Sequence, residues 1–345
     1  MATAAKPNDK PLPVPKCDFY MIEGVLDASE AAIIEKVRTF MHDRVAPIIN
    51  DYWVRDAFPF ELIEPLKKLG LGTIGLENST PQFRGMLIME MCRVDASFAT
   101  FFGVHHDLAM GSIAMLGSEE QRDRWIPKMA SLEIIGCFAL TEPLVGSGSG
   151  GGLTTTAKRE GDEWVLNGEK KWIGNAPWCD VSVVWARDVE DGQVKGFLVE
   201  NKSTPGFTVE KIEKKMALKV VQNGHITMTD CRVPDANHLK GASTFRDTAK
   251  VLRETRSGVG WMATGVQMGA YENAVRYAQQ RQQFGKPIGS FQLLQELIAK
   301  MLANLTACQS MMLRLAEIEQ LRSRWWRWPT GLFPAARRRC RPMPV

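Results

Sequence analysis

A run of short apolar segments separated by turn residues lies between two helical regions, and it constrains the fold of this 345-residue chain more than any other feature. The segments are rich in β-branched and aromatic residues, as strands are, and cover residues 154–158, 163–166, 181–186, 196–199, 207–209 and 225–228. Pairs typical of tight turns separate them at Asn167-Gly168, Asp191-Gly192, Pro205-Gly206 and Asn223-Gly224. Short strands at this spacing predict a small antiparallel barrel or sandwich.

Helical patterns surround this run. Asp27 and Glu30 fit a capping box before an apolar stripe that ends at Pro47. More helices are expected over residues 59–69, 84–94, 97–116 and 119–129, and two long ones over 245–283 and 291–320. The order predicts an α+β chain with an N-terminal helical domain (25–134), a central antiparallel β-barrel (135–240) and a C-terminal helical domain (241–320).

Neither end of the chain fits this plan. Residues 1–24 begin with a segment rich in Pro and Lys and are expected to be disordered, with no secretory signal or clear transit peptide. Residues 321–345 are expected to be an aberrant basic tail, because Trp, Arg, Pro, Ala and Gly dominate it without any apolar period. Out-of-frame translation of GC-rich DNA is the favoured origin. The alternatives are a disordered basic tail and binding of an interface, a nucleic acid or a membrane by the Trp/Arg cluster.

Composition excludes several classes of function. The net charge is only +4, and the arginines of the tail supply more than that, so the charge does not predict a nucleic-acid partner. Seven scattered cysteines without a Cys-x-x-Cys pair favour a reducing compartment and argue against a zinc site or a disulfide framework. No apolar run is long enough to span a membrane, so no membrane partner and a cytoplasmic location are expected, and no metal site is predicted.

The glycine-rich run from Gly146 to Gly152 is not a nucleotide-binding loop. Such a loop needs a helix after it, whereas a strand-like segment follows here. Alone, the run would be a flexible linker. However, Thr141-Glu142-Pro143 precedes it, and backbone amides and a hydroxyl beside a rigid Pro turn suit the edge of a planar heterocycle. Trp172 is a candidate to cover the face of that ring, and its alternative role is in the barrel core.

Three segments, in this order, resemble the flavin-binding motifs of the acyl-CoA dehydrogenase family. Phe138 to Ser147 resembles F-A-L-T-E-P-x-x-G-S, Trp172 begins the W-I-G segment, and Arg281 begins R-x-x-F-G. The resemblance covers about residues 25–320 and implies that FAD is the cofactor. It implies flavin binding by Phe138, Ala139, Leu140, Thr141, Glu142, Pro143, Gly146, Ser147, Trp172, Ile173 and Gly174. It also implies that Arg281, Phe284 and Gln292 contact the FAD of a neighbouring subunit.

The resemblance implies α,β-dehydrogenation of a short-chain acyl-CoA to the enoyl-CoA, by proton abstraction and hydride transfer to the flavin. Thr100, Ser147 and Arg256 would contact the substrate, and electron-transfer flavoprotein or oxygen would accept the electrons. Within the family the chain is most similar to the short-chain acyl-CoA oxidase and glutaryl-CoA dehydrogenase branch. Ala99 stands where the glutaryl-binding Arg of that branch would align, which favours a monocarboxylic substrate. Intact relatives form homotetramers.

Two departures from the family pattern concern catalysis. Gly148 replaces the usual Asp, and the family's C-terminal helices, with the segment that carries the catalytic base, have no counterpart, so the chain is expected to be C-terminally truncated. Glu254 is a candidate base, but relatives with a base on this helix place it directly before the Arg. One position rotates a side chain by about 100°, so a solvated surface charge is the favoured interpretation.

Other interpretations remain open from the sequence. His105-His106-Asp107 could form a proton relay or a metal pair, although adjacent residues point to different helix faces and packing is favoured. A catalytically inert fragment that binds FAD or acyl-CoA is the first alternative function. An acyl-CoA oxidase that uses oxygen is the second.

Overall fold

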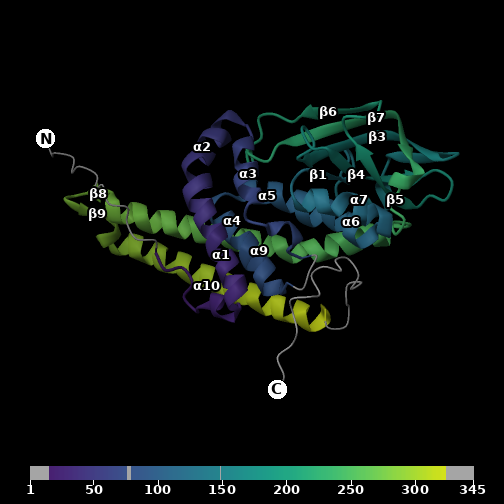
Figure 1. The fold of residues 1–345 in the computed structure, drawn as a ribbon. Coiled ribbons are helices and arrows are strands. Elements are labelled where there is room, and N and C mark those ends of the chain that lie inside the picture. Colours follow the sequence, from purple (N-terminus) through teal and green to yellow (C-terminus); the bar gives the residue numbers. More distant parts are fainter. Residues whose placement is uncertain (1–14, 76–78, 148, 324–345) are drawn as a thin grey trace, which may run out of the picture.

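The computed structural model describes residues 15–75, 79–147 and 149–323. Helices from the two ends of the chain pack together, and a curled sheet lies at one end of the helical body (Figure 1). The predicted α+β class, with helical, sheet and helical regions in that order, is confirmed. Among the described residues, no helix is both long and apolar enough to cross a bilayer.

The N-terminal region begins with a nearly continuous helical rod. It comprises the 3-10 turn η1 (Ile22–Val25), α1 (Ala28–Phe40), the π-helical turn η2 (Met41–Val45) and α2 (Ala46–Arg55). The Asp27–Glu30 capping box is present at the start of α1. The predicted stop at Pro47 is wrong, because this proline lies in the first turn of α2, where its missing N–H costs nothing.

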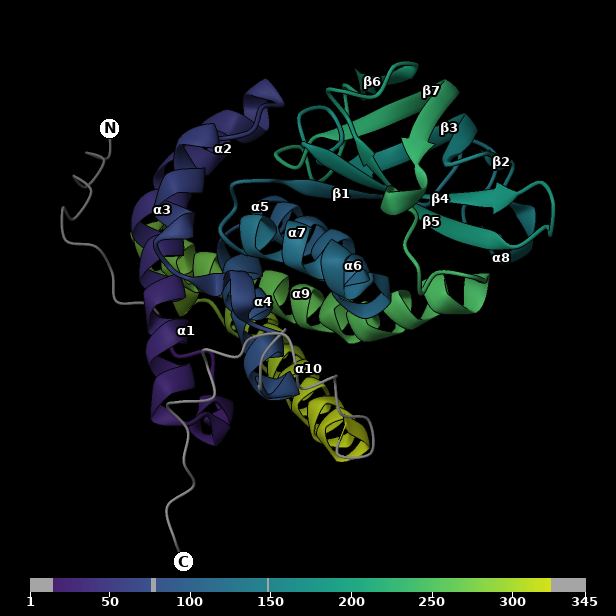
Figure 2. The same cartoon turned by 45° about the vertical axis from the view of Figure 1, so that its right-hand side comes forward.

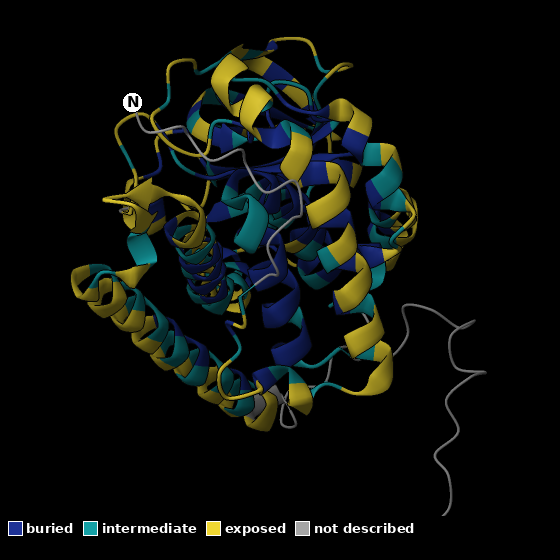
Figure 3. Ribbon diagram, turned by 90° about the vertical axis from the view of Figure 1, so that its left-hand side faces the viewer, coloured by how far each residue is buried: buried dark blue, intermediate teal, exposed yellow. Residues whose placement is uncertain are grey.

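Helix α4 (Pro81–Val94) is buried along nearly its whole length (Figure 3), and several shorter helical segments complete the N-terminal region. They are η3 (Phe60–Leu62), α3 (Ile63–Lys67), η4 (Leu71–Thr73), α5 (Ala96–Gly103), the π-helical η5 (Val104–Met110), α6 (Gly111–Leu116) and α7 (Glu119–Ala130). Helix α4 packs against α1, α5 and both long C-terminal helices, so it is the centre of the helical body.

The central region is a seven-stranded sheet with the order β1-β4-β2-β3-β7-β6, and β5 pairs with β4. Its strands are β1 (Gly136–Ala139), β2 (Thr156–Glu160), β3 (Glu163–Gly174), β4 (Val181–Asp188), β5 (Val194–Glu200), β6 (Phe207–Lys211) and β7 (Asn223–Pro234). The sheet is curled and mostly antiparallel, but β1 and β2 each pair in parallel with β4. The strand pattern alone does not predict these two parallel pairs.

Two of the predicted turns are wrong. Asn167-Gly168 lies inside β3, and Asn223-Gly224 lies at the start of β7, which pairs with β3. The pairing of β3 with β7 shifts its register between Leu166 and Gly168, where Gly168 has a φ of 137°. Gly at this position therefore serves a bulge within a long strand rather than a hairpin turn.

The C-terminal region is an antiparallel pair of long helices, as predicted. Helix α9 (Phe245–Gln280) starts beside the sheet, and α10 (Gln292–Ser323) returns along it. The strands β8 (Gln282–Gln283) and β9 (Lys286–Pro287) and the turn η7 (Ile288–Ser290) connect them. This connection lies at the far end of the helical pair from the sheet (Figures 1 and 2).

The expected disorder of residues 1–24 does not hold for residues 15–24. Cys17 and Ile22 are buried in the helical core, and Asp18 accepts hydrogen bonds from the backbone of η1. Burial of apolar side chains therefore holds this segment in place. The Pro- and Lys-rich composition of the preceding residues led to the expectation of disorder. Residues 1–14 lie outside the described part of the chain. In the expected tail, residues 321–323 continue α10, and residues 324–345 also lie outside the description.

Candidate functional site

The loop that follows β1, residues 140–147, is called the Thr141 loop here. Two hydrogen bonds between the backbones of Glu142 and Val145 (3.0 and 3.2 Å) close a tight turn around Pro143 and Leu144. Leu144 is 94% exposed, and Gly146 and Ser147 are exposed as well. Upstream, Phe138, Ala139 and Leu140 are buried, so the exposed part of the segment begins after Leu140.

Trp172 lies beside this loop because β3 bulges there. The register of β3 against β7 shifts between Lys170 and Ile173, and Trp172 adopts a φ of 65°, in the left-handed region. Its indole is 54% exposed, while Ile173 is buried. The Lys171 N–H donates a hydrogen bond to the Thr141 carbonyl oxygen (2.9 Å), which fixes the loop next to the indole. A bulky residue at positive φ is strained, and strain of this kind gathers at functional sites.

Helix α5 and η5 support this surface from below. The Asn175 amide donates to the carbonyl oxygens of Phe101 (3.1 Å) and Gly136 (3.4 Å), which ties the end of β3 to α5 and β1. A Cβ built on Gly174 would lie 3.3 Å from Val104, so the strand end and η5 are in close contact. Barrel and helical region therefore meet directly at the residues that follow Trp172.

Glu142 does not point toward the surface. Its carboxylate is buried and accepts hydrogen bonds from the Lys170 ammonium (2.8 Å), from the Thr154 N–H and hydroxyl (both 2.7 Å) and from the Thr155 N–H (2.9 Å). Burial acts to raise the pKa of Glu142, but Lys170 and the hydrogen bonds outweigh it and hold the pKa at about 2. Glu142 is thus a buried anion inside the barrel, beneath the predicted flavin-binding segment.

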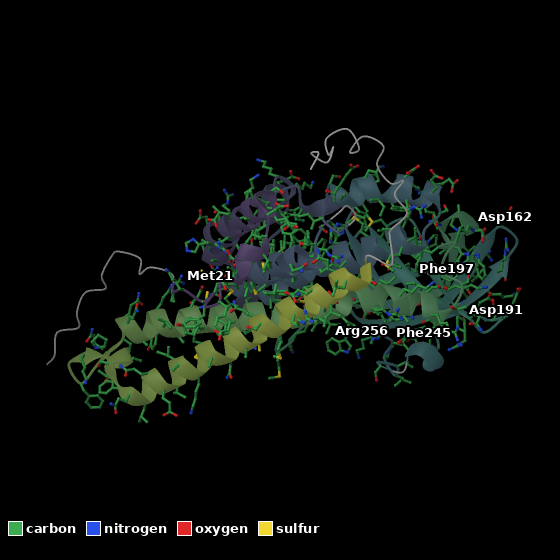
Figure 4. All side chains as sticks on the ribbon, turned by 90° about the horizontal axis from the view of Figure 1, so that it is seen from below. Met21, Asp162, Asp191, Phe197, Phe245 and Arg256 are labelled. Atoms are coloured by element: carbon green, nitrogen blue, oxygen red, sulfur yellow. The ribbon has the colours of Figure 1, made fainter. Side chains whose placement is uncertain are left out.

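The three residues predicted to contact the substrate have different environments. Thr100 is half-buried on α5, and its hydroxyl donates to the Ala96 carbonyl oxygen one turn earlier (2.7 Å). Ser147 is exposed at the end of the Thr141 loop. Arg256 is exposed on α9, in the same half of that helix as Phe245 (Figure 4).

The start of α9 contacts the glycine-rich segment. A Cβ built on Gly150, in the single helical turn α8 (Ser149–Gly152), would lie 2.9 Å from the Phe245 ring. The run that follows the Thr141 loop therefore ends against the helix that carries Arg256. The structure thus joins the loop, Trp172, α5 and α9 at one side of the sheet.

Arg281, Phe284 and Gln292 lie elsewhere. All three are exposed at the tip of the α9–α10 pair, where Phe284 is 91% exposed with a φ of 52°. The tip is far from the sheet in two views (Figures 1 and 2). Within one chain the structure does not bring these residues to Trp172, and the family resemblance assigns them to the cofactor of a neighbouring subunit.

Glu254 lines a cleft of about 80 Å³ between α4, η5, α9 and α10, together with Arg84, His106, Asp107 and Glu319. The residues lining this cleft include no member of the Thr141 loop and not Trp172. The structure therefore does not join Glu254 to the predicted flavin-binding residues.

The two adjacent histidines point to different partners, as predicted from helix geometry. His105 is buried, donates from Nε2 to the Met129 carbonyl oxygen (2.9 Å) and accepts from the Gly136 N–H at Nδ1 (3.0 Å). Burial lowers the pKa of His105 to about 4. His106 pairs with Asp107 (2.7 Å) and stacks on Phe102. No group of three or more His, Cys, Asp or Glu within the described ranges is arranged to hold a metal ion.

A cavity of about 800 Å³ lies away from this surface, and none of its lining residues belongs to the Thr141 loop. It is bordered by residues 15–18, α1, α4 and α9, and a chain of ion pairs crosses it. Arg38 bridges Glu23 and Glu90, and Arg93 bridges Glu90 and Glu272. The sequence does not predict this network, because its members are far apart in the chain. All of these charges are paired within the network. Because Glu23 is one of its members, the network holds the segment around residues 15–24 against α1.

Known proteins show the same domains. Family models for the N-terminal, middle and C-terminal domains of acyl-CoA dehydrogenases match residues 27–133, 137–231 and 245–323. An acyl-CoA dehydrogenase of Bacillus subtilis is 34% identical over 295 residues, which are 82% of this chain and 76% of that protein. The human mitochondrial short-chain specific acyl-CoA dehydrogenase is 31% identical over 308 residues, which are 85% of this chain and 73% of that protein.

A solved structure agrees with these matches. The chain is similar to a glutaryl-CoA dehydrogenase from Mycobacterium smegmatis, crystallised in complex with FADH2, with a TM-score of 0.82 and 32% identity. The superposition covers 91% of this chain and 80% of that one. The domain order, the curled sheet and the sequence identity agree, and the chain belongs to the acyl-CoA dehydrogenase family, whose members are flavoprotein oxidoreductases that act on CH–CH bonds.

Proposed function

We propose that this chain binds FAD on the surface formed by the Thr141 loop and Trp172, and that it serves the α,β-dehydrogenation of a short-chain, monocarboxylic acyl-CoA. The observation that carries the proposal is the exposed indole of Trp172, held at positive φ and locked to the loop through the Lys171–Thr141 hydrogen bond. A strained, exposed aromatic plane beside a rigid turn is unfavourable for folding alone and suits a planar ring.

The residues of this surface fit a flavin. Trp172 is 54% exposed and offers a stacking face, and the Lys171–Thr141 hydrogen bond holds the half-buried Thr141 next to the strand that carries it. A Cβ built on Gly146 would meet no atom within 4 Å, so the loop leaves open space at Gly146. When bound, FAD supplies the acceptor for the hydride that leaves the β-carbon. The chain's own contribution is to bind and orient that ring and to exclude water from one of its faces.

Ala99 supports a monocarboxylic substrate. It is fully buried, and its neighbours Phe98 and Phe101 belong to the aromatic core. A second carboxylate buried at such a position would lose its hydration without gaining a cation, which costs several kcal/mol in order of magnitude. We therefore expect butyryl-CoA to be preferred over glutaryl-CoA.

Abstraction of the α-proton needs a base. The carboxylate within the Thr141 loop, Glu142, is not free to act as one. Glu142 is held by Lys170, Thr154 and Thr155 and stays ionised in the barrel interior. Glu254 borders a separate cleft with Arg84 and His106. No described residue is assigned the role of base here. We also propose that the site is assembled from two subunits. Residues of one copy would contact the FAD of another copy, namely Arg281, Phe284 and Gln292.

The test uses the full chain loaded with FAD under anaerobic conditions. Visible flavin absorption is followed while butyryl-CoA is added, and glutaryl-CoA serves as the matched comparison. The proposal predicts bleaching by butyryl-CoA and a much weaker response to glutaryl-CoA. Recovery of the absorption on adding electron-transfer flavoprotein identifies a dehydrogenase, and recovery in air identifies an oxidase. Bound flavin that neither thioester bleaches identifies an inert binding fragment and contradicts the proposed turnover.

A further inference from the structure

Lys170 is a lysine with no exposed surface, in the strand that carries Trp172. Its ammonium donates hydrogen bonds to the Leu140 carbonyl oxygen (3.2 Å) and to Glu142 (2.8 Å). Removing an ammonium and a carboxylate from water costs several kcal/mol each, and an apolar pair of similar volume is often equally stable or more so. Stability alone is therefore a weak reason for this buried pair.

The Lys170–Glu142 pair fixes the Thr141 loop at two points. Leu140 and Glu142, the two acceptors of Lys170, flank Thr141 in the chain. Glu142 extends the connection to Thr154 and Thr155, which precede β2. The Lys170 ammonium thus joins three segments at one point: β3, the Thr141 loop and the entry to β2.

The pair lies directly beneath the proposed flavin surface. Lys170 and Trp172 flank Lys171, whose N–H binds the Thr141 carbonyl oxygen from the same strand. The loop therefore contacts β3 through two successive residues, by the buried side chain of Lys170 and by the backbone of Lys171. The bulge that exposes Trp172 begins at Lys170, where the register with β7 shifts.

We propose that Lys170 is a positioning residue for the flavin site: its ammonium, buried between Leu140 and Glu142, sets the Thr141 loop in register with the Trp172 indole. The inference rests on the proposed function, since it assigns a role within the same site. Lys170 does not touch the cofactor in this account and acts through the loop.

The experiment compares two buried ion pairs in one sheet. Lys170→Met removes the proposed positioning contact. Lys195→Met is the matched control, because the Lys195 side chain is only 14% exposed and pairs with Asp188 and with Asp191 (2.9 Å) in the β4–β5 hairpin, and none of these residues belongs to the Thr141 loop. FAD affinity and the visible spectrum of the bound flavin are measured for the full chain, with Tm recorded for each variant.

We expect Lys170→Met to weaken FAD binding at least about 10-fold, which corresponds to about 1.4 kcal/mol, and to shift the flavin spectrum toward that of free FAD. Lys195→Met should stay within about 2-fold of the wild type, a difference of under about 0.5 kcal/mol, whatever its effect on Tm. Equal affinities and identical spectra for wild type and Lys170→Met would overturn the inference.

A double variant covers the case in which Lys170→Met alone does not fold. Lys170→Met with Glu142→Gln removes both charges and keeps an amide oxygen that can accept from the Thr154 and Thr155 N–H groups, so it should fold. The inference predicts that this folded protein still binds FAD weakly with an altered spectrum, and wild-type affinity in it would refute the positioning role. A wild-type chain that fails to bind FAD at all would instead refute the proposed function, so the two failures are distinguishable.

Discussion

His105 is a buried imidazole with both ring nitrogens engaged, since Nε2 donates to Met129 and Nδ1 accepts from Gly136. This arrangement requires the neutral form, because a protonated ring would lose the bond from the Gly136 N–H. The residue links α7 to β1 and so helps to fix the strand that leads into the Thr141 loop.

The His105 environment predicts a pH dependence of stability. Its pKa is lowered from 6.5 to about 4 in the folded chain, so the unfolded chain binds the extra proton first as pH falls. We expect stability to fall between pH 6.5 and about 4 by an amount on the order of 3 kcal/mol from this residue. Urea unfolding across this range measures it, and His105→Gln should show a flatter profile. Parallel profiles for the two proteins would contradict the assignment.

Glu142 predicts a second loss of stability at lower pH, because its pKa is also lowered in the folded chain. Its folded pKa of about 2 lies below the ordinary value of 4.5, so its contribution is complete above pH 4.5 and is lost as pH falls toward 2. At neutral pH, Glu142→Gln should cost about 3–5 kcal/mol, because Lys170 would be left buried and unpaired. The difference in unfolding free energy between wild type and variant should shrink as pH falls below 4.5. A constant difference would show that the ion pair does not form.

The sequence predicted the proximity of Thr141 and Trp172 better than the direction of the Glu142 side chain. Thr141 and Trp172 were predicted to lie together, and the Lys171–Thr141 hydrogen bond places them so. Glu142 was predicted to bind the cofactor, but its side chain points into the barrel toward Lys170. Glu142 lies in a loop, where no alternation predicts the direction of a side chain, and its partner Lys170 is distant in the sequence.

At the level of elements, α4 and α9 pack closely because small residues face the partner backbone. A Cβ built on Gly265 would lie 2.3 Å from the Met89 carbonyl oxygen, and one on Gly269 would lie 2.1 Å from that of Arg93. Glycine inside a long helix usually lowers its stability. At these two positions glycine allows the two helices to approach closely, because any side chain would collide with the partner backbone.

The packing of α9 gives a prediction with an internal control. Gly265→Ala should destabilise the chain by about 1–3 kcal/mol, because the methyl group forces the helices apart. Gly258→Ala in the same helix meets no atom within 4 Å and should stabilise it by up to about 1 kcal/mol. Chemical unfolding of both variants tests this, and equal effects would contradict the helix–helix contact.

Helix positions were predictable from periodicity, while strand pairing was not. The apolar stripes placed α7, α9 and α10 within a few residues of their observed bounds. The parallel pairing of β1 and β2 with β4 depends on contacts between segments far apart in the chain, which no local pattern encodes. For the same reason, the ion pairs that hold residues 15–24 against α1 and α4 escaped sequence analysis.

For the whole molecule, the predicted binding residues divide into two groups at opposite ends. The Thr141 loop and Trp172 lie at the sheet, and Arg281, Phe284 and Gln292 lie at the tip of the long helical pair (Figures 1 and 2). A single chain cannot bring them to one cofactor, so the account predicts that FAD promotes self-association. Sedimentation of the chain with and without FAD measures this. An unchanged monomer with FAD fully bound would contradict a site shared between subunits.

The central claim is that the Trp172 indole and the Thr141 loop hold a flavin, and titration of FAD into the full chain tests it most directly. Trp172→Gly is the matched variant, because glycine adopts positive φ without strain and removes only the ring. Loss of one aromatic stacking contact of about 1–3 kcal/mol predicts FAD binding about 5- to 150-fold weaker than in the wild type. Equal FAD affinity of wild type and variant, or no FAD binding by the wild type, would contradict the account.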